Sequence, residues 1–276
     1  MGKIIAICNQ KGGTGKTTTA INLGASLALL NKRILLVDLD PQANATSGLG
    51  LDKYKIEKST YDVLLDQMPI AEVIVDTAIP GLKLAAANLD LTGAEVELVG
   101  VLGREHRLKK ALQAEQNNFD FLLIDSPPSL GLLTINGLCA ADSVLIPVQC
   151  EYYALEGLTQ LINTIELVRN NLNPQLAIEG VVLTMADFRT NLTKEVIQET
   201  RNYFSRLEMS NRGRVFQTII PRNIRLTEAP SFGKPIILYD RFSIGSQRYD
   251  ELAREILGLS GEEKTTPTLV TEIGEQ

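Results

Sequence analysis

The sequence predicts an α/β fold with a doubly wound, mostly parallel sheet that has helices on both faces. Short, nearly continuous apolar runs alternate with segments of helical spacing along the chain, and such runs are typical of strands buried on both faces. The first run leads through a glycine-rich turn into a helix and a second strand, a β–loop–α–β unit that predicts a right-handed crossover. No linker rich in Pro, Gly or Ser divides the middle of the 276 residues, which favours one large domain.

The expected elements follow in chain order. Apolar runs predict strands at Lys3–Cys8, Ile34–Asp38, Leu82–Ala86, Phe121–Asp125, Ser143–Val148, Gly180–Met185 and Val215–Ile220. Helical spacing predicts helices that include Thr17–Leu30, Arg104–Gln116, Leu155–Asn171, Lys194–Phe204 and Ser246–Leu257. The polar, Arg-rich stretch Ser205–Arg214 predicts an exposed loop. Ligands of such folds bind beyond the carboxyl ends of the strands, so functional residues are expected at that edge.

Composition excludes several classes of protein. The chain is 44% hydrophobic and 22% charged, as in ordinary globular proteins. Its three cysteines are far apart and it has one histidine, which argues against a disulfide framework or a zinc site. No apolar run approaches the roughly 20 residues that span a bilayer. We expect a cytoplasmic protein with no membrane attachment.

Charge is distributed unevenly along the chain. The net charge of −6 argues against attraction of the whole surface to nucleic acid. The stretch Arg201–Arg225, however, holds six arginines against Glu208, a net of +5, so one face can still be basic. The end, Gly261–Gln276, holds four glutamates against Lys264, a net of −3. We expect a folded domain over residues 1–258 and a disordered acidic tail over 259–276.

The most informative stretch is a glycine-rich loop between the first strand and the first helix. It reads Lys11-Gly12-Gly13-Thr14-Gly15-Lys16-Thr17-Thr18. Its glycines let backbone N–H groups converge on phosphate oxygens, and the positive end of the following helix points at the same place. Lys16 would reach the β- and γ-phosphates, and the Thr17 hydroxyl would hold Mg²⁺. The general phosphate-loop pattern requires glycine where this chain has Gln10. The chain instead reads KGGxGKTT, with an extra lysine at Lys11, which is the deviant Walker A motif. The alternative is a glycine-rich turn that binds nothing.

Carboxylates follow two of the expected strands. Asp38 and Asp40 end the run that begins at Ile34, and Asp125 ends the run that begins at Phe121. Carboxylates beside bound Mg²⁺ hold its waters or orient an attacking water. We therefore expect Thr17, Asp40 and Asp125 at a metal site, although carboxylates at strand ends also serve as turn or cap residues.

These motifs resemble the ParA/Soj family of partition ATPases, within the larger group that also holds MinD and the nitrogenase iron protein. The resemblance covers residues 1 to about 257. Besides the loop, it rests on DLDPQANATSGLG from Asp38, DSPPSLGLLTINGL from Asp125, PVQCEYYALEGL from Pro147 and PRNIRLTEAPSFGKPI from Pro221.

The resemblance implies a mechanism. ATP binding would join two subunits face to face, and Lys11 would cross the interface to the partner's phosphates. Asp40 would position the hydrolytic water, so Lys11, Lys16 and Asp40 are the expected catalytic residues. The loop residues 11–18 would bind the nucleotide together with Met185, Pro221 and Asn223, which match the segments near the adenine.

The resemblance also implies partners. The ATP-bound homodimer would bind nonspecific double-stranded DNA through Arg189, Arg222 and Arg225, since guanidinium groups contact phosphate oxygens well. A ParB-type protein would stimulate a weak ATPase, and the protein would associate with the nucleoid and drive chromosome or plasmid partition.

Other readings stay open at this point. A ParA-like ATPase that positions another cargo has the same motifs, as has a regulatory ATP-binding protein with little turnover. A MinD-like membrane ATPase would need an amphipathic basic end, whereas this chain ends in GEEKTTPTLVTEIGEQ. A nitrogenase-like electron carrier would need cluster cysteines, and Cys139 and Cys150 stand outside such contexts.

Overall fold

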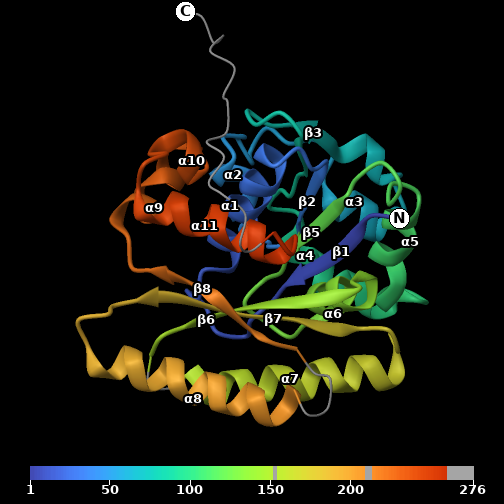
Figure 1. Ribbon diagram of the computed structural model, residues 1–276. Coiled ribbons are helices and arrows are strands. Elements are labelled where there is room, and N and C mark those ends of the chain that lie inside the picture. The colour runs from blue at the N-terminus through green and yellow to red at the C-terminus, as the bar shows by residue number, and fades with distance from the viewer. Residues whose placement is uncertain (152–153, 209–212, 260–276) are drawn as a thin grey trace, which may run out of the picture.

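The structure is a computed structural model that describes residues 1–151, 154–208 and 213–259. Within these ranges, eight strands form one sheet in the order β3-β4-β2-β5-β1-β6-β7-β8 (Figure 1). Seven strands are parallel, and the short edge strand β3 is antiparallel to β4. The doubly wound, mostly parallel sheet expected from the sequence is confirmed.

The bounds of the elements agree with most expected runs to within a few residues. The strands are β1 Lys3–Ile7, β2 Ile34–Asp38, β3 Ile74–Asp76, β4 Leu82–Ala85, β5 Phe121–Asp125, β6 Ser143–Gln149, β7 Ala177–Ala186 and β8 Val215–Pro221. The α-helices are α1 Lys16–Leu29, α2 Asn44–Gly48, α3 Thr60–Leu65, α4 Leu91–Glu97, α5 Arg107–Gln113, α6 Leu132–Ala140, α7 Ala154–Asn171, α8 Asn191–Glu208, α9 Ile224–Glu228, α10 Ile236–Tyr239 and α11 Ile244–Ile256. Short 3₁₀ turns are η1 Ile70–Val73, η2 Leu98–Gly100, η3 Arg104–His106 and η4 Ala229–Phe232.

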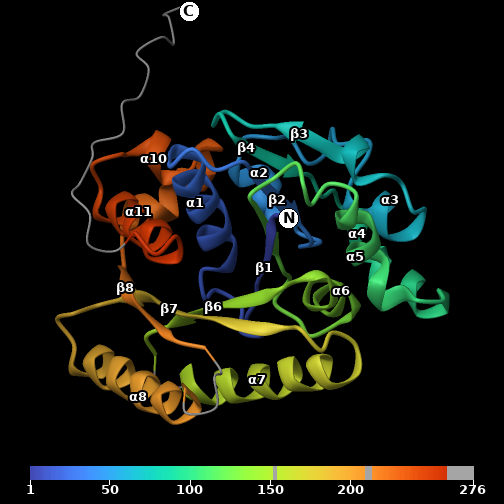
Figure 2. The same cartoon turned by 45° about the vertical axis from the view of Figure 1, so that its right-hand side comes forward.

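Helices cover both faces of the sheet. Helices α3 to α8 pack on one face, and α1 with α9 to α11 pack on the other (Figures 1 and 2). The central strand β1 shows why its run is apolar throughout. Ile4 and Ala6 face the first core, whereas Ile5 and Ile7 face the second. Each of these side chains is at least 95% buried, so alternation with polar residues would leave a polar group in a core.

Two local expectations are corrected. The expected loop Ser205–Arg214 begins too early, because α8 continues through Glu208. Arg206, Leu207 and Glu208 are all good helix formers, and the polarity of the stretch did not stop the helix; residues 209–212 lie outside the described ranges. The expected helix Arg104–Gln116 is also shorter, since η3 occupies its first turn and α5 ends at Gln113.

The strand order determines where the loop lies. β1 pairs with β5 on one side and with β6 on the other, so the loop after β1 leaves the middle of the sheet. The carboxyl ends of β2, β5, β6, β7 and β8 all point to the same edge, because these strands are parallel. The segments that follow these strands therefore surround the loop.

Candidate functional site

The loop after β1 leads directly into the uncapped end of α1. Gly13 and Gly15 have φ angles of +73° and +86°, which other residues adopt only with strain. Gly15 is the N-cap of the 14-residue helix and offers no side-chain acceptor to its first turn. The N–H groups of that turn, which carry the positive end of the helix dipole, are thus available to an anion.

A cavity of about 270 Å³ lies at this helix end. Its lining comprises the expected loop residues Gly12, Gly13, Gly15, Lys16, Thr17 and Thr18 together with Asp40, Asn44, Pro128 and Met185. A Cβ added at Gly12 or Gly13 would meet no protein atom within 4 Å. The space over the backbone of these two glycines is therefore open to a ligand.

Lys16 is a buried cation inside this loop. Its relative exposure is 7%, and its Nζ donates to the carbonyl oxygen of Lys11 at 3.2 Å. Burial lowers the pKa of the Lys16 ammonium, while the nearby carboxylates of Asp125 and Asp40 act to raise it. Since no carboxylate is in salt-bridge contact with Lys16 in the described ranges, an incoming phosphate would supply the missing anionic partner.

Asp125 lies beneath the loop with unused oxygens. It is fully buried, and neither oxygen has a hydrogen-bond partner among the described residues. Burial, followed by the neighbouring Asp38 carboxylate, raises the pKa of Asp125 well above its usual range. The hydroxyl of Thr17 lies near enough to act in the opposite direction, but it forms no hydrogen bond of standard geometry with Asp125. Two buried, unpartnered carboxylate oxygens near a threonine hydroxyl are suitable ligands for a hard cation such as Mg²⁺.

The neighbouring carboxylate Asp38 has a different environment. It accepts from the backbone N–H and the hydroxyl of Thr46, both at 2.8 Å, and from the N–H of Asp40 at 3.0 Å. Burial nevertheless raises the pKa of Asp38 to about 6. Asp38 thus holds the chain that follows β2, and through it the position of Asp40.

Asp40 lines the cavity and is oriented by the turn that it begins. Its Oδ1 accepts from the N–H of Gln42 at 3.0 Å, and its Oδ2 accepts from the side chain of Asn44 at 3.2 Å. Both oxygens are therefore held in direction while the residue borders the cavity that contains the loop. This arrangement suits a carboxylate that accepts a proton or orients a water.

A second, larger cavity continues from the first. Its volume is about 480 Å³, and it shares Gly15, Thr18 and Met185 with the loop cavity. Met185 has a φ of +53°, unusual for a residue with a Cβ, and this strained backbone lies where the two cavities meet. The expected residues Pro221 and Asn223 also line it.

The larger cavity has polar groups beside apolar walls. Asn223 Oδ1 accepts from Leu226 N–H at 3.3 Å as the N-cap of α9, and its side-chain NH₂ has no partner in the described ranges. Leu226, Ile220 and Pro230 supply apolar surface. A flat, apolar ring with hydrogen-bonding edges fits such a cavity.

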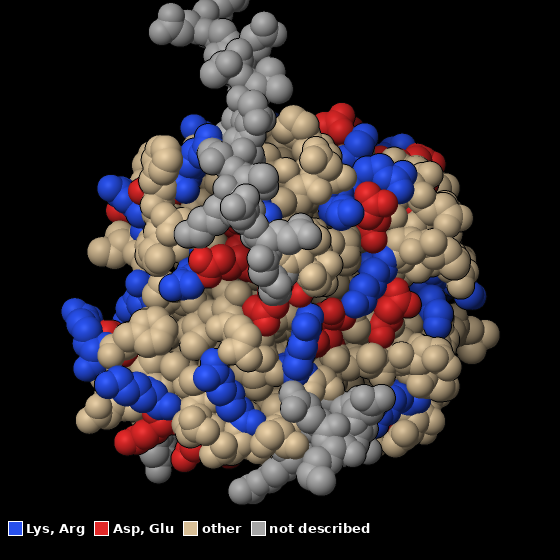
Figure 3. Space-filling view, in the orientation of Figure 1, with Lys and Arg blue, Asp and Glu red and all other residues tan. Residues whose placement is uncertain are grey.

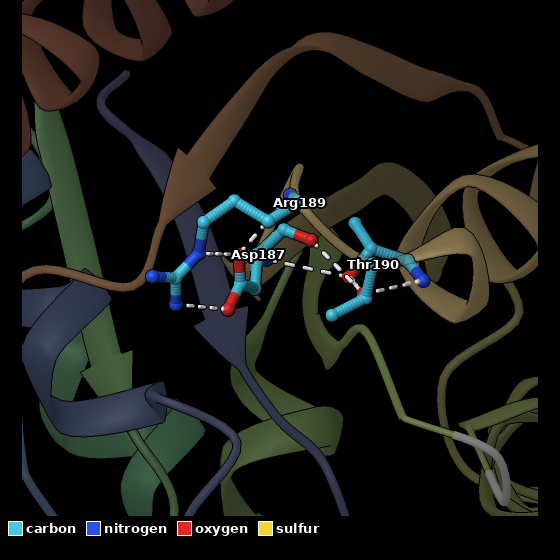
Figure 4. A network of polar contacts seen from close by, with 4 residues as sticks. Asp187, Arg189 and Thr190 are labelled. Atoms are coloured by element: carbon cyan, nitrogen blue, oxygen red, sulfur yellow. Dashed lines mark hydrogen bonds and ion pairs between the residues drawn. The ribbon is translucent and has the colours of Figure 1, made fainter.

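The three expected DNA-contacting arginines lie at the same edge but differ in their partners. Arg189 follows β7 and binds Asp187 with two hydrogen bonds, of 2.8 and 2.6 Å (Figure 4). Arg222 follows β8, is exposed, and its backbone N–H bonds to Ala186 at the end of β7. Arg225, in α9, pairs with Glu228 at 3.0 Å and Asp240 at 3.5 Å.

The three arginines differ in whether a carboxylate already neutralises their charge, and therefore in how readily they would bind a further anion. The guanidinium of Arg189 and its N–H lower the pKa of the Asp187 carboxyl to about 2, and the more distant Arg222 acts in the same direction. Arg222 itself has no ion pair among the described residues. Figure 3, drawn in the orientation of Figure 1, shows Lys and Arg side chains at the left of the molecule, over the ends of β7 and β8 and the start of α8.

Arg214 lies elsewhere. It precedes β8, whereas Arg222 follows it, so the length of the strand, roughly 20 Å, separates them. Its guanidinium lies 4.6 Å from the centroid of the Phe216 ring and bonds to the Glu255 carbonyl oxygen. The side chain of Arg214 thus contacts residues of its own chain, Phe216 and Glu255. The other arginine near the end of the corrected loop, Arg212, lies outside the described residues.

Several residues at the site carried no sequence signal of their own. Thr184 donates its hydroxyl to the carbonyl oxygen of Thr14 at 2.9 Å and so fixes the loop to β7. Asn44 orients Asp40, and Tyr249 of α11 borders the larger cavity. Glu151 bonds to Lys11. Asn44 and Glu151 stood within recognisable motifs, but the contacts of Thr184 and Glu151 join residues far apart in the chain, which the sequence does not show.

None of the helices in the described ranges has the length and apolar character needed to cross a membrane.

Comparisons with known proteins agree with the geometry. A family model described as an AAA domain matches residues 2–178. The sporulation initiation inhibitor protein Soj of Bacillus subtilis (strain 168) is 58% identical over 256 residues, which are 93% of this chain and 98% of that protein. The chromosome partitioning protein ParA of Myxococcus xanthus (strain DK1622) is 55% identical over 257 residues, with 93% and 88% covered.

A solved structure extends the comparison. Cobyrinic acid a,c-diamide synthase from Mycobacterium smegmatis, with bound ATP analog and magnesium, is 37% identical, with a TM-score of 0.78 over 95% of this chain and 98% of that one. The fold is that of a P-loop NTPase, as the loop motif predicted. With more than half of its residues shared with Soj and ParA over nearly all of its length, the chain belongs to the ParA/Soj family of chromosome-partitioning ATPases.

Proposed function

We propose that this chain binds ATP with Mg²⁺ and hydrolyses the ATP slowly unless a partner stimulates it. The observation that carries the proposal is the uncapped end of α1 beside the buried Lys16 and the unpartnered Asp125. The anion-binding N–H groups and the Lys16 cation meet at one cavity. The Asp125 carboxylate is buried behind it, close enough to Lys16 to act on the pKa of that ammonium. The ATP analog and magnesium bound by the Mycobacterium smegmatis protein support this ligand.

The residues take separate roles in this proposal. The backbone of the loop cradles the phosphates, and Lys16 neutralises charge on the β- and γ-phosphates. The hydroxyl of Thr17 would hold Mg²⁺, with Asp125 and Asp40 binding the ion or its waters; a bound Mg²⁺ supplies neutralisation of charge on the phosphate oxygens. Asp40 also orients the attacking water, which is the main task left to a protein in phosphoryl transfer.

The base is expected in the larger cavity. Met185 and Pro221 would pack on it, and Asn223 would use its free NH₂ group at a ring edge. The shared boundary of the two cavities at Gly15 and Thr18 supports one ligand occupying both.

We further propose that ATP converts the chain into a homodimer that binds nonspecific double-stranded DNA. Lys11 would reach the partner's phosphates, while Arg189, Arg222 and Arg225 would contact DNA backbone phosphates. The dimer would carry two copies of this basic edge, so the bound nucleotide would control the affinity for DNA. The similarity to Soj and ParA supports a role in chromosome or plasmid partition with a ParB-type partner, in the cytoplasm on the nucleoid.

The division of the chain is also a proposal. Residues 1–258 would form the ParA-type ATPase domain, and the acidic segment 259–276, nearly all of it outside the described residues, would form a tail.

A second cargo is the main alternative. The motifs of the site serve equally well in a ParA-like ATPase that positions something other than chromosomes, since the partner selects the cargo. The similar protein from Mycobacterium smegmatis is a cobyrinic acid a,c-diamide synthase. That likeness supports the nucleotide and metal ligands here, whereas the more identical Soj and ParA support partition.

Turnover measurements test the proposal. ATPase rates are compared with and without DNA and a candidate ParB protein, for the unsubstituted chain and for Asp40→Ala. We expect partner-stimulated turnover, and a fall on the order of 100-fold in Asp40→Ala with ATP binding retained. Asn44→Ala, which removes one of the hydrogen bonds to Asp40, should lose less. A normal rate in Asp40→Ala would show that another group positions the water.

A further inference from the structure

The side chain of Lys11 lies against the end of β6 rather than in the loop cavity of its own chain. Its Nζ donates to Oε2 of Glu151 at 2.8 Å. The residues that line the loop cavity include Lys16 but not Lys11. The lysine that the proposed dimer sends across the interface is therefore engaged within its own subunit.

Glu151 is itself held by the strand that precedes it. Its Oε1 accepts from the side-chain amide of Gln149, the last residue of β6, at 2.5 Å. Its backbone N–H donates to the Gln149 carbonyl oxygen at 2.8 Å. One carboxylate oxygen is thus fixed to the end of the sheet, and the other is directed at Lys11.

The backbone of the loop is tied to the same strand. The side chain of Asn9 donates to the Pro147 carbonyl oxygen at 2.7 Å and accepts from the Lys11 N–H at 3.0 Å. Both partners of the ion pair therefore stand on segments anchored to β6. The packing of the loop on β6 therefore brings Lys11 and Glu151 together, unlike a surface ion pair whose two side chains stand on unconnected segments.

The exposure of the pair limits its strength. About two fifths of each side chain is exposed, 42% for Lys11 and 43% for Glu151. Pairs of this kind change an equilibrium by at most about fivefold. A triphosphate carries more negative charge than one carboxylate, so a partner's ATP can displace Glu151 at a modest cost.

We propose that Glu151 is a positioning residue for Lys11. In the single chain it keeps the ammonium out of its own cavity and directed along the end of β6. In the ATP dimer Lys11 leaves Glu151 for the partner's phosphates, so the pair opposes premature dimerisation by a few-fold. This inference rests on the proposed ATP-dependent dimer.

The pair itself is tested in nucleotide-free protein by NMR of the lysine side-chain Nζ groups. Glu151→Gln keeps the side-chain size and removes the charge, so the Lys11 signal should shift while the Lys16 signal stays. Glu156→Gln removes an exposed charge in the first turn of α7 and should move neither signal. An unmoved Lys11 signal in Glu151→Gln would overturn the pairing.

The consequence is tested by light scattering with Mg²⁺ and a non-hydrolysable ATP analogue. Glu151→Gln should lower the nucleotide concentration that gives half-maximal dimer by about two- to fivefold, and Glu156→Gln should leave it unchanged. An unchanged or higher midpoint in Glu151→Gln would overturn the role of Glu151 alone. Failure of the unsubstituted protein to dimerise would instead contradict the proposed function, and the NMR result would then decide only whether Glu151 holds Lys11.

Discussion

Asp38 and Asp125 lie opposite each other in the parallel register of β2 and β5, yet of the two carboxylates only that of Asp38 accepts hydrogen bonds from the described residues. Asp38 accepts from Thr46 and from the Asp40 N–H. Both oxygens of Asp125 are buried without a partner in the described ranges. The two adjacent carboxylates therefore differ in environment: Asp38 holds the chain after β2, whereas Asp125 has no hydrogen-bond partner among the described residues.

This difference predicts opposite effects of the same substitution. Asp38→Asn should lower the free energy of unfolding by about 1–3 kcal/mol, because an amide cannot accept hydrogen bonds on both sides. Asp125→Asn should not lower it, since it removes a buried, unpartnered carboxylate, but it should weaken Mg²⁺–ATP binding at least about tenfold. Urea denaturation without nucleotide and a nucleotide titration measure these effects. Equal destabilisation by both variants would contradict the assignment.

Arg222 should contribute to DNA binding in a way that salt reveals. It is exposed at the end of β8 and has no ion pair among the described residues. Arg222→Ala should reduce the slope of log affinity against log salt concentration by about 1 per chain, because one phosphate contact is lost. Arg33→Ala is the control, since Arg33 precedes β2 at the opposite edge and pairs with Asp120. A parallel salt dependence for Arg222→Ala and the unsubstituted protein would remove Arg222 from the interface.

Gly50 and Gly233 form a close backbone contact that joins the segment after α2 to the turn after η4. A Cβ on Gly50, where φ is +87°, would lie 2.9 Å from the Gly233 carbonyl oxygen. Gly103 has a similar φ of +66° but open space around it. Both alanine variants pay about 1 kcal/mol for the left-handed backbone, and Gly50→Ala should cost about 1–3 kcal/mol more for the clash. An equal loss in the free energy of unfolding for Gly50→Ala and Gly103→Ala in urea denaturation would show that the Gly233 turn moves to accommodate the added Cβ without cost.

Asp120 should give the protein part of its acid stability. Hydrogen bonds from the side chain and then the N–H of Arg33 lower the pKa of Asp120 from 3.8 to about 2. The folded state therefore binds fewer protons than the unfolded state between these values, and this contribution is present above about pH 4 and lost as pH falls towards 2. The pair is largely exposed, so the effect is small. The free energy of unfolding should change less with pH in this window for Asp120→Asn than for the unsubstituted protein. Equal slopes for the two proteins would show that the Arg33–Asp120 pair does not contribute to acid stability.

The sequence predicted the parts of this structure that depend on neighbouring residues. Continuous apolar runs that each end at an aspartate indicated β2 and β5 to the residue, because strands buried on both faces are apolar on both faces up to their carboxyl ends. The glycines and Lys16 indicated the loop, because that residue order suits few other structures. The edge strand β3 has two partly exposed residues and an exposed aspartate, so it lacked such a run and was not predicted.

Long-range contacts could not be predicted in the same way. Glu151 reaches Lys11 only because β6 pairs beside β1. The positive φ of Met185 and the missing partners of Asp125 depend on packing around them, which their residue types do not encode. Likewise, the sequence indicated an arginine-rich stretch. It did not show that the Arg214 guanidinium stacks over the Phe216 ring, or that Arg222 has no ion pair within the part of the chain that the structure describes.

The mass of the protein in solution tests the central claim most directly. Sedimentation of the Asp40→Ala variant with Mg²⁺ and ATP, compared with Mg²⁺ and ADP, separates a nucleotide-switched dimer from a simple nucleotide binder. We predict twice the chain mass of 30.2 kDa with ATP and the single-chain mass with ADP. The same mass with both nucleotides, although both bind, would contradict the account.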